Sequence, residues 1–216
     1  MRLFTVIAFC SAILSLLSAK LRAGLSAVLL LCVSFSSAYA TPILILGDSL
    51  GASYGVSPEQ GWVNLLQQKM PQHTFINGSV SGETSAGGLR RLPALLESAT
   101  PKLVVVELGG NDGLRGFPPK QLKENLTKII QLSQAQGAKV LLSEVMVPPN
   151  YGPRYANQFT AVYHELAKEY DITLMPFFME PVAVDPNLMQ RDGIHPNADA
   201  QPIITEFVYP WINKAL

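Results

Sequence analysis

Residues 43–51 read ILILGDSLG, and this stretch decides the fold class. Its first four residues are all apolar, with no polar residue at alternate positions. Such a run is typical of a strand that is buried on both faces, as in a parallel sheet that helices cover on each side. Gly47, Asp48 and Ser49 follow at once, so the strand is expected to end there.

Strands and helices are expected to alternate along the rest of the chain. Apolar runs rich in β-branched residues predict strands at 43–47, 74–77, 103–108, 139–147 and 172–177. Segments with helical periodicity lie near residues 62–70, 85–97, 119–136, 155–170 and 200–214. This alternation predicts the α/β class, as a three-layer α/β/α sandwich around a five-stranded parallel sheet. In such sheets, ligands bind beyond the carboxyl ends of the strands.

The first forty residues differ in composition from the rest, because they contain no Asp or Glu. Lys20 and Arg22 form a basic flank, and an apolar run follows at 23–35. Residues 38–40 read AYA, which has the small-x-small pattern of a cleavage site. We therefore predict a signal peptide at 1–40 that is cleaved after Ala40.

The remainder, 41–216, has the length of a single domain. Another apolar stretch at 3–17 leaves three alternatives open: an unusually long leader, a start downstream of Met1, or an uncleaved anchor. The anchor would span both apolar stretches and is disfavoured because Lys20 and Arg22 interrupt them. The run at 23–35 alone is shorter than the ~20 residues of a membrane span.

Both cysteines, Cys10 and Cys32, lie in the predicted signal peptide, and neither follows the small residue that a lipoprotein cleavage site requires. The mature chain would then have no thiol, which excludes a disulfide, a cysteine nucleophile and a cysteine metal site. Of 16 Lys and Arg residues 13 remain after cleavage, against 16 Asp and Glu, so the mature net charge is −3. Without a basic run, nucleic acid is not an expected partner.

Four short segments carry the candidate chemistry, and three of them follow a predicted strand. They are GDSL at 47–50, SGET at 81–84, GGND at 109–112 and DGIHP at 192–196. The first three are expected to meet at the carboxyl edge of the sheet.

Ser49, His195 and Asp192 are suited to acyl transfer. A serine hydroxyl needs a base to take its proton, and an imidazole both accepts that proton and returns it to the leaving group. Asp192 lies three residues before His195 and can bond the far ring nitrogen, which is the orienting role in a catalytic triad. The other histidines, His73 and His164, have no acid at this spacing in a loop marked by Gly and Pro and are expected to be solvated.

The tetrahedral intermediate of acyl transfer also needs hydrogen-bond donors for its oxyanion. The backbone N–H groups of Ser49 and Gly82 and the side-chain amide of Asn111 are expected to converge on it from three neighbouring strand ends. A glycine suits position 82, because a missing side chain leaves the N–H open to substrate.

Each of these residues also has a simpler interpretation. Ser49 alone is compatible with a turn serine, Gly82 with a turn glycine, and Asp192 with a surface acid. Asn111 and the acid after it are compatible with an Asx-turn. Asp48 is equally suited to support the nucleophile by hydrogen bonding or to cap a turn.

Two other hydrolase classes are not favoured. GDSLG at 47–51 and GASYG at 51–55 both fit the G-x-S-x-G pattern of α/β-hydrolases, but that fold needs several strands before the nucleophile and only one precedes Ser49. A metal hydrolase needs clustered His and carboxylate ligands, and the sequence has no such cluster, so no metal or other cofactor is expected.

Together, the four segments resemble the blocks of the SGNH or GDSL family of hydrolases, which carry Ser, Gly, Asn and His. Ser49, Gly82, Asn111 and His195 stand in that order, and Asp192 completes the family's Asp-x-x-His arrangement. The likeness covers essentially all of the predicted mature chain and is closest to the periplasmic thioesterase and lysophospholipase members. This closer likeness is carried by LPALL at 92–96, VELGGNDGLRGF at 106–117 and DGIHPNADAQP at 192–202.

The resemblance implies a flavodoxin-like sheet with a shallow, exposed active site that needs no cofactor. It implies hydrolysis of acyl thioesters, lysophospholipids and small esters through an acyl-enzyme on Ser49. In the loop 113–119, Leu114 and Phe117 would contact the acyl chain, with 146–155 as the opposite wall. The expected protein is a monomer without stable membrane insertion, in the periplasm of a Gram-negative bacterium or secreted. Two alternatives stay open: a short-chain carbohydrate acetylesterase on the same fold, and a non-catalytic lipid-binding protein of the envelope.

Overall fold

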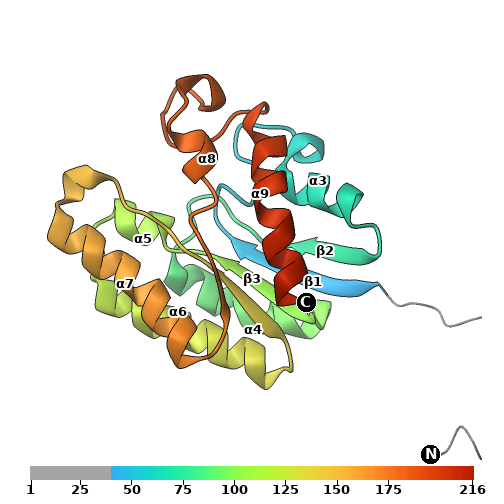
Figure 1. Ribbon diagram of the computed structural model, residues 1–216. Coiled ribbons are helices and arrows are strands. Elements are labelled where there is room, and N and C mark those ends of the chain that lie inside the picture. Colours follow the sequence, from blue (N-terminus) through green and yellow to red (C-terminus); the bar gives the residue numbers. More distant parts are fainter. Residues whose placement is uncertain (1–39) are drawn as a thin grey trace, which may run out of the picture. The chain divides into compact units, whose positions relative to one another are not determined.

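A five-stranded parallel sheet forms the centre of the described chain, in the strand order β2-β1-β3-β4-β5 (Figure 1). The computed structural model describes residues 40–216, so the predicted signal peptide and its two cysteines lie outside the described residues. The strands are β1 (Thr41–Gly47), β2 (His73–Asn77), β3 (Leu103–Glu107), β4 (Lys139–Ser143) and β5 (Thr173–Met175). The predicted α/β class and flavodoxin-like sheet are confirmed.

Helices cover both faces of this sheet (Figure 1). One face carries α4 (Ser85–Ala99), α6 (Pro119–Ala135) and α7 (Pro153–Glu169), and the other carries α3 (Trp62–Lys69) and α9 (Ala200–Ala215). The connections contain the short helices α5 (Gly110–Leu114) and α8 (Glu180–Ala183) and the 3-10 turns η1 (Pro58–Gln60), η2 (Pro149–Tyr151) and η3 (Pro186–Leu188). In residues 40–216, no helix has both the length and the apolar character needed to cross a bilayer.

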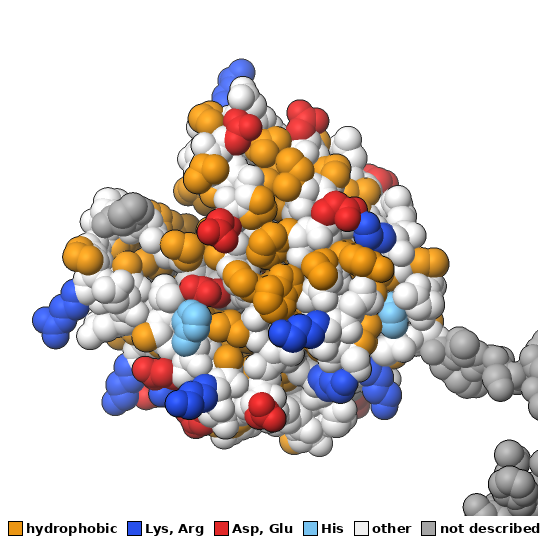
Figure 2. Space-filling model, in the orientation of Figure 1, with side chains coloured by type: hydrophobic (Ala, Val, Ile, Leu, Met, Phe, Trp, Pro, Cys, Tyr) orange, Lys and Arg blue, Asp and Glu red, His pale blue; other side chains and the backbone are white. Residues whose placement is uncertain are grey.

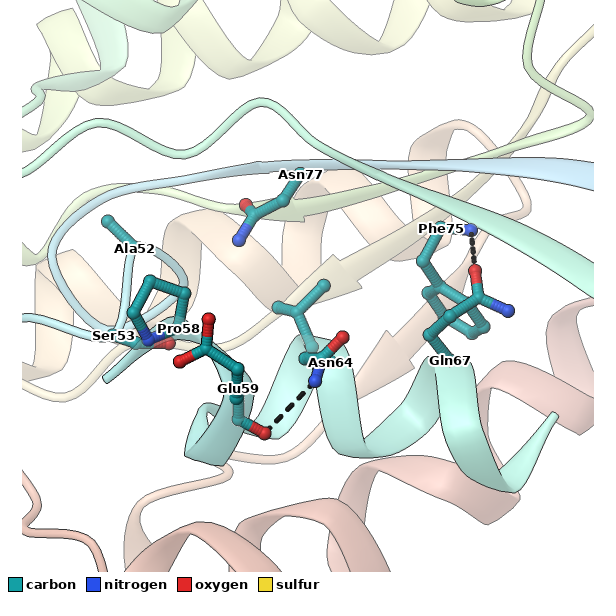
Figure 3. Close-up of a pocket in the computed structure, with 9 residues that line it drawn as sticks. Ala52, Ser53, Pro58, Glu59, Asn64, Gln67, Phe75 and Asn77 are labelled. Carbon is teal, nitrogen blue, oxygen red and sulfur yellow. Dashed lines mark hydrogen bonds between the residues drawn. The ribbon is translucent and has the colours of Figure 1, made fainter. Parts of the chain in front are cut away.

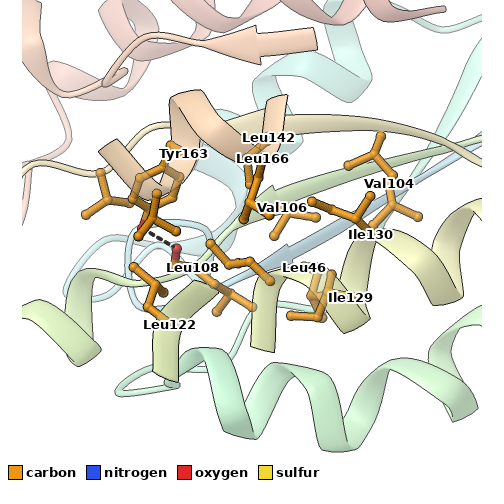
Figure 4. Packing of buried hydrophobic residues seen from close by; sticks show 14 of the residues in the cluster. Leu46, Val104, Val106, Leu108, Leu122, Ile129, Ile130, Leu142, Tyr163 and Leu166 are labelled. Atoms are coloured by element: carbon orange, nitrogen blue, oxygen red, sulfur yellow. Dashed lines mark hydrogen bonds between the residues drawn. The ribbon is translucent and has the colours of Figure 1, made fainter. Parts of the chain in front are cut away.

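Each face of the sheet has its own hydrophobic core, built from alternate residues of the same strands. In β1, Leu44 and Leu46 face α4, α6 and α7, whereas Ile43 and Ile45 face α3 and α9, and all four are fully buried. Figure 4 shows the first core, where leucine and valine side chains of adjacent strands pack against α6 and α7. Burial on both faces explains why the run at 43–46 has no polar alternation, and each such side chain contributes roughly 1.5–3 kcal/mol.

A buried tyrosine fixes the point at which the chain leaves β3. The Tyr163 hydroxyl of α7 donates to the carbonyl of Leu108 at 2.9 Å (Figure 4). Gly109 follows with φ of +122°, and a Cβ there would lie 2.0 Å from the Tyr163 hydroxyl oxygen. The glycine therefore lets the chain turn tightly under α7, directly before Asn111.

Two strands end two or more residues earlier than predicted, and β3 ends one residue earlier, at Glu107. β4 stops at Ser143 rather than at 147, and β5 is limited to Thr173–Met175. Val145 and Val147 prolonged the predicted strand because they are apolar, and both are buried, but they enter the core from a loop. Val147 packs against Gly113, where an added Cβ would lie 2.3 Å from Val147 Cγ1. This loop therefore lies against the segment that follows Asn111.

One histidine differs from its predicted environment. His73 is the first residue of β2 and is half-buried, not solvated before the strand, and burial lowers the pKa of its imidazole. His164 agrees with the prediction, since its side chain is exposed on α7, with Nε2 3.4 Å from Glu144 Oε2.

Charges of both signs are dispersed over the visible surface. Figure 2 shows apolar side chains gathered over α8 and α9, with Lys, Arg and acidic side chains scattered along the lower edge. On this face, the described residues form no continuous basic patch of the kind that a nucleic-acid backbone requires.

Candidate active site

The register of the sheet brings three of the four predicted segments to one edge. Gly47, at the end of β1, pairs with Glu107, at the end of β3, so the segments that follow these strands begin side by side. The chain beyond β2 continues along β1, because Gly78 N–H donates to Ile45 O at 2.8 Å and Val80 N–H donates to Gly47 O at 3.1 Å. The edge lies where the strand order reverses around β1, the position at which such sheets bind ligands.

Ser49, His195 and Asp192 form one connected chain of hydrogen bonds. Ser49 Oγ lies 2.9 Å from His195 Nε2, and His195 Nδ1 lies 2.7 Å from Asp192 Oδ2. Ser49 is half-buried and the His195 side chain is 16% exposed, so the imidazole is shielded while the serine stays reachable. The structure therefore brings the three predicted residues together in the arrangement that a catalytic triad requires.

Asp192 is held as a carboxylate by its own loop. Its Oδ1 accepts the backbone N–H of His195 at 3.0 Å and that of Ile194 at 2.9 Å. The backbone N–H of His195, then the His195 side chain and the Ile194 N–H, lower the pKa of the Asp192 carboxyl to about 2. Asp192 therefore stays charged near neutral pH and favours a proton on His195 Nδ1, which leaves Nε2 free to accept the proton of Ser49.

Gly82 lies in a tight turn that leaves its backbone N–H free. Glu83 N–H donates to Val80 O at 3.1 Å, and Gly82 has φ of +78°, which fits the third position of a type II turn. Arg91 of α4 supports this turn, since its Nε lies 2.6 Å from Glu83 Oε2 and its Nη1 donates to Gly78 O at 2.9 Å. Within residues 40–216, neither Gly82 N–H nor Ser49 N–H has a hydrogen-bond acceptor.

Asn111 does not form an Asx-turn, because it lies in α5 and its side chain reaches across to other segments. Its Nδ2 donates to Asp48 Oδ2 at 3.1 Å and to the carbonyl of Glu83 at 3.0 Å. The amide thus lies between the serine segment and the Gly82 turn, where an oxyanion donor is needed. Both of its N–H groups already have acceptors, so an oxyanion would share or replace one of these bonds.

Asp48 and Glu107 form a buried carboxyl pair beneath the serine. Asp48 Oδ1 accepts Leu50 N–H at 3.0 Å, so Asp48 both caps the turn and holds Asn111. Glu107 is 1% exposed, and its Oε2 accepts the backbone N–H of Asp48 at 3.2 Å. Burial raises the pKa of Asp48 to about 6, and burial, followed by the Asp48 charge, raises the pKa of Glu107 well above its usual value. Burial therefore favours the neutral form of both carboxyls, and of Glu107 in particular.

Two glycines make room for this pair. A Cβ at Gly47 would lie 2.6 Å from Glu107 Oε2, and one at Gly51 would lie 2.3 Å from Ser79 Oγ. Ser79 Oγ is itself buried and has no hydrogen-bond partner in the described structure. The carboxyl of Glu107 is thus enclosed by the backbone of the serine segment and by one hydroxyl.

Replacing Glu107 by Gln is expected to flatten the pH dependence of stability. In the native state Glu107 keeps a proton that the unfolded chain releases above the usual pKa of 4.5. Glu107 therefore makes the free energy of unfolding fall as the pH rises above that value. Glu107→Gln carries no such proton. Urea unfolding of the wild type and the variant at about pH 5 and about pH 8 measures how far the free energy of unfolding declines in each. One proton changes this free energy by at most ~1.4 kcal/mol per pH unit.

Glu97→Gln is the matched control, because Glu97 is exposed on α4. This control should reproduce the wild-type decline in unfolding free energy. An equal decline in Glu107→Gln and in the wild type would contradict a buried neutral Glu107.

The loop proposed to contact an acyl chain is tied to the segment opposite. Tyr151 O–H donates to Leu114 O at 2.6 Å, and Tyr155 O–H donates to Phe117 O at 2.7 Å. Leu114 is 38% exposed and Phe117 is half-buried. The two predicted walls therefore lie together, and contact of Leu114 and Phe117 with substrate stays a prediction.

A separate hollow lies on the far side of the serine segment. It has a volume of about 260 Å³ and lies between Ala52–Ser53, α3 and β2, with Asn64, Gln67 and Phe75 in its wall (Figure 3). Ser49, Asn111 and His195 are not among its lining residues. In residues 40–216, no group of three or more His, Cys, Asp or Glu side chains is placed to hold a metal ion.

Comparison with known proteins places this chain in a known family. The family model of the GDSL-like lipase/acylhydrolases matches residues 45–202, a span that contains all four segments. An arylesterase of Vibrio mimicus is 49% identical over 196 residues, which are 89% of this chain and 98% of the relative. Thioesterase 1/protease 1/lysophospholipase L1 of Escherichia coli K12 is 50% identical over 188 residues, which are 87% and 88% of the two chains. The crystal structure of the psychrotrophic esterase EstA from Pseudoalteromonas sp., inhibited by monoethylphosphonate, matches with 50% identity and a TM-score of 0.77 over 80% of this chain and 96% of that one.

Proposed function

The chain belongs to the GDSL-like lipase/acylhydrolase family and is an ester hydrolase, and we propose that it acts through an acyl-enzyme on Ser49. The observation that carries the proposal is the hydrogen-bonded chain from Ser49 through His195 to Asp192, with separations of 2.9 Å and 2.7 Å. The substrates proposed are carboxylic esters and acyl thioesters, including lysophospholipids.

In the first half-reaction, Ser49 Oγ attacks the acyl carbon while His195 Nε2 takes the hydroxyl proton. The charge of Asp192 stabilises the imidazolium that forms. His195 then gives this proton to the leaving alcohol or thiol, and the acyl group remains on Ser49. In the second half-reaction a water molecule takes the place of the alcohol, and His195 acts as base and then as acid again.

The oxyanion of each tetrahedral intermediate is proposed to lie among three donors: the backbone N–H groups of Ser49 and Gly82 and the Asn111 amide. The free N–H groups at positions 49 and 82 support this assignment, as does the position of Asn111 between the two segments. Donors that are held before the reaction stabilise developing charge without reorganisation.

Asn111→Ala is expected to lower kcat by about 10²–10³, with little change in KM, because an oxyanion donor acts mainly in the transition state. Steady-state kinetics on a nitrophenyl ester measure the effect. Asn125→Ala serves as a control, since Asn125 Nδ2 donates to Ser85 Oγ at 2.9 Å and not to the site. A variant at position 111 that keeps the wild-type kcat would remove Asn111 from the oxyanion assignment.

The acyl preference is tested with a series of substrates. We expect the mature chain to hydrolyse octanoyl to palmitoyl nitrophenyl esters, acyl-CoA and lysophospholipid faster than acetyl esters, with Leu114 and Phe117 in contact with the chain. A steep preference for acetyl esters would favour the carbohydrate acetylesterase alternative. Absence of turnover on every activated ester would favour a binding protein.

We also propose that residues 1–40 direct export and are cleaved after Ala40, and that the mature chain acts as a monomer in the periplasm. The basic flank, the apolar run and the AYA tripeptide at 38–40 support export. Intact mass of the protein recovered from a periplasmic extract tests the cleavage: a species that begins at Thr41 supports it, and a retained leader contradicts it. Sedimentation of the same material tests the monomer.

A further inference from the structure

The two loops that carry Ser49 and His195 come from distant parts of the chain. We call residues 47–55 the serine loop and residues 190–196 the histidine loop. Ser49 and His195 are 146 residues apart in sequence, yet their side chains must stay within proton-transfer distance. A serine–histidine hydrogen bond is too weak to define the separation of two loops by itself.

Gln190 joins these loops with both N–H groups of its side-chain amide. Its Nε2 donates to Tyr54 O in the serine loop at 2.7 Å and to Pro196 O in the histidine loop at 2.9 Å. Its backbone N–H donates to His195 O at 2.8 Å. Gln190 therefore donates hydrogen bonds to the carbonyls of His195 and Pro196 in its own loop and to the Tyr54 carbonyl in the serine loop.

The backbone of the serine loop is shaped to receive this side chain. Gly55 has φ of +73°, and a Cβ there would lie 2.2 Å from Gln190 Oε1. The residue before Gln190 is also fixed, because Met189 forms an isolated antiparallel β-bridge with Pro196. Gln190 is thus held by contacts within the histidine loop, and its side chain fits closely against Gly55 of the serine loop.

Tyr54 contacts both members of the proposed nucleophile–base pair. Its backbone N–H donates to Ser49 O at 3.0 Å, and its ring centroid lies 4.5 Å from that of the His195 imidazole, at an interplanar angle of 40°. An aromatic ring this close limits rotation of the imidazole and attracts it more strongly once it is protonated. The Tyr54 side chain is 52% exposed, so structural support of the core does not account for its position.

We propose that Gln190 and Tyr54 are positioning residues that hold His195 against Ser49, Gln190 by fixing the distance between the loops and Tyr54 by fixing the orientation of the imidazole. This inference rests on the proposed function, in which His195 takes the Ser49 proton. Neither Tyr54 nor Gln190 belongs to the four segments at 47–50, 81–84, 109–112 and 192–196.

Gln190→Ala is expected to lower kcat on a nitrophenyl ester by about 10-fold or more with KM nearly unchanged, because small misplacement of a base lowers the rate steeply. The rate of phosphonylation by a fluorophosphonate should fall by the same factor, since it also depends on His195 taking the Ser49 proton. Tyr54→Ala should lower both rates, and Tyr54→Phe, which keeps the ring, should lose less than Tyr54→Ala. In Gln190→Ala/Tyr54→Ala the fold-losses should not multiply, because both residues act on the position of one imidazole.

Gln67→Ala is the matched control. Gln67 also joins two elements by its side chain, since Nε2 donates to His73 O at 2.9 Å and Oε1 accepts Phe75 N–H at 2.9 Å. Figure 3 shows the second of these bonds. Gln67→Ala should lower the melting temperature and leave kcat unchanged. Gln190→Ala should lower kcat in protein that is still folded at the assay temperature.

The proposal is overturned if folded Gln190→Ala and Tyr54→Ala both keep the wild-type kcat and phosphonylation rate. It is also overturned if Gln190→Ala behaves as Gln67→Ala does. In either case a wild type that still hydrolyses esters through Ser49 would leave the proposed function intact. A wild type with neither turnover nor adduct would remove the proposed function itself.

Discussion

Ser49→Ala is expected to reduce turnover of an activated ester by about 10⁵–10⁶, to a rate set by the remaining donors and binding contacts. The acyl group then has no hydroxyl to accept it, although His195, Asp192 and the oxyanion donors remain. Because the hydroxyl acts in the chemical step, kcat should fall while substrate binding persists. Steady-state kinetics in the variant, with single-turnover measurements to exclude trace wild-type enzyme, check the result.

Ser53→Ala is the control, because Ser53 occupies the same place in a second G-x-S-x-G pattern at 51–55. Ser53 is 8% exposed and has φ of +57°, so its substitution is expected to change stability more than rate. Turnover that survives in Ser49→Ala and is lost in Ser53→Ala would contradict the assignment of the nucleophile.

His195→Ala is expected to lower kcat by a similar factor, about 10⁵, because the serine then lacks a base and the leaving group lacks an acid. The losses in Ser49→Ala and His195→Ala should not multiply in the double variant, since the two residues act as one unit. Added imidazole should restore part of the activity of His195→Ala and none of the activity of Ser49→Ala.

His164→Ala controls for the loss of an imidazole elsewhere. Its side chain is 58% exposed and its nearest acid is Glu144 at 3.4 Å, so its removal should leave kcat unchanged. Full activity of His195→Ala, or a strong loss in His164→Ala, would be incompatible with the proposed base.

The meeting of the candidate segments could be predicted from the sequence, because each segment depends on a local pattern. Ser49 and Asn111 follow apolar strands directly, and the carboxyl ends of neighbouring parallel strands must meet. Asp192 and His195 are three residues apart, so their pairing is decided within one loop.

Asp48 was considered as a support for the serine, but Glu107 and Gln190 were not predicted, because their contacts are distant in sequence. Glu107 ends an apolar run, and its partner, the N–H of Asp48, is 59 residues away. Gln190 and the Tyr54 carbonyl are 136 residues apart. Nothing in the composition of either segment indicates such a bond, since a glutamine in a polar loop is ordinarily solvated.

The helix α5 was also missed, for a related reason. Its five residues, Gly110–Leu114, contain two glycines, which have low helix propensity. Tertiary contacts hold it instead: Asp112 is fully buried and accepts both Ser85 N–H at 2.8 Å and Ser85 O–H at 2.5 Å. Packing against the start of α4 therefore overrides a sequence that favours a loop.

Mapping the site of phosphonylation tests whether His195 activates Ser49 for attack on an acyl carbon. Mature protein is incubated with a fluorophosphonate, digested and analysed by mass spectrometry, with His195→Ala treated in parallel. We expect one adduct per chain, on the peptide that contains Ser49, and a strongly reduced labelling rate in His195→Ala. An adduct on another residue, or equally fast labelling without the imidazole, would contradict this activation of Ser49 by His195.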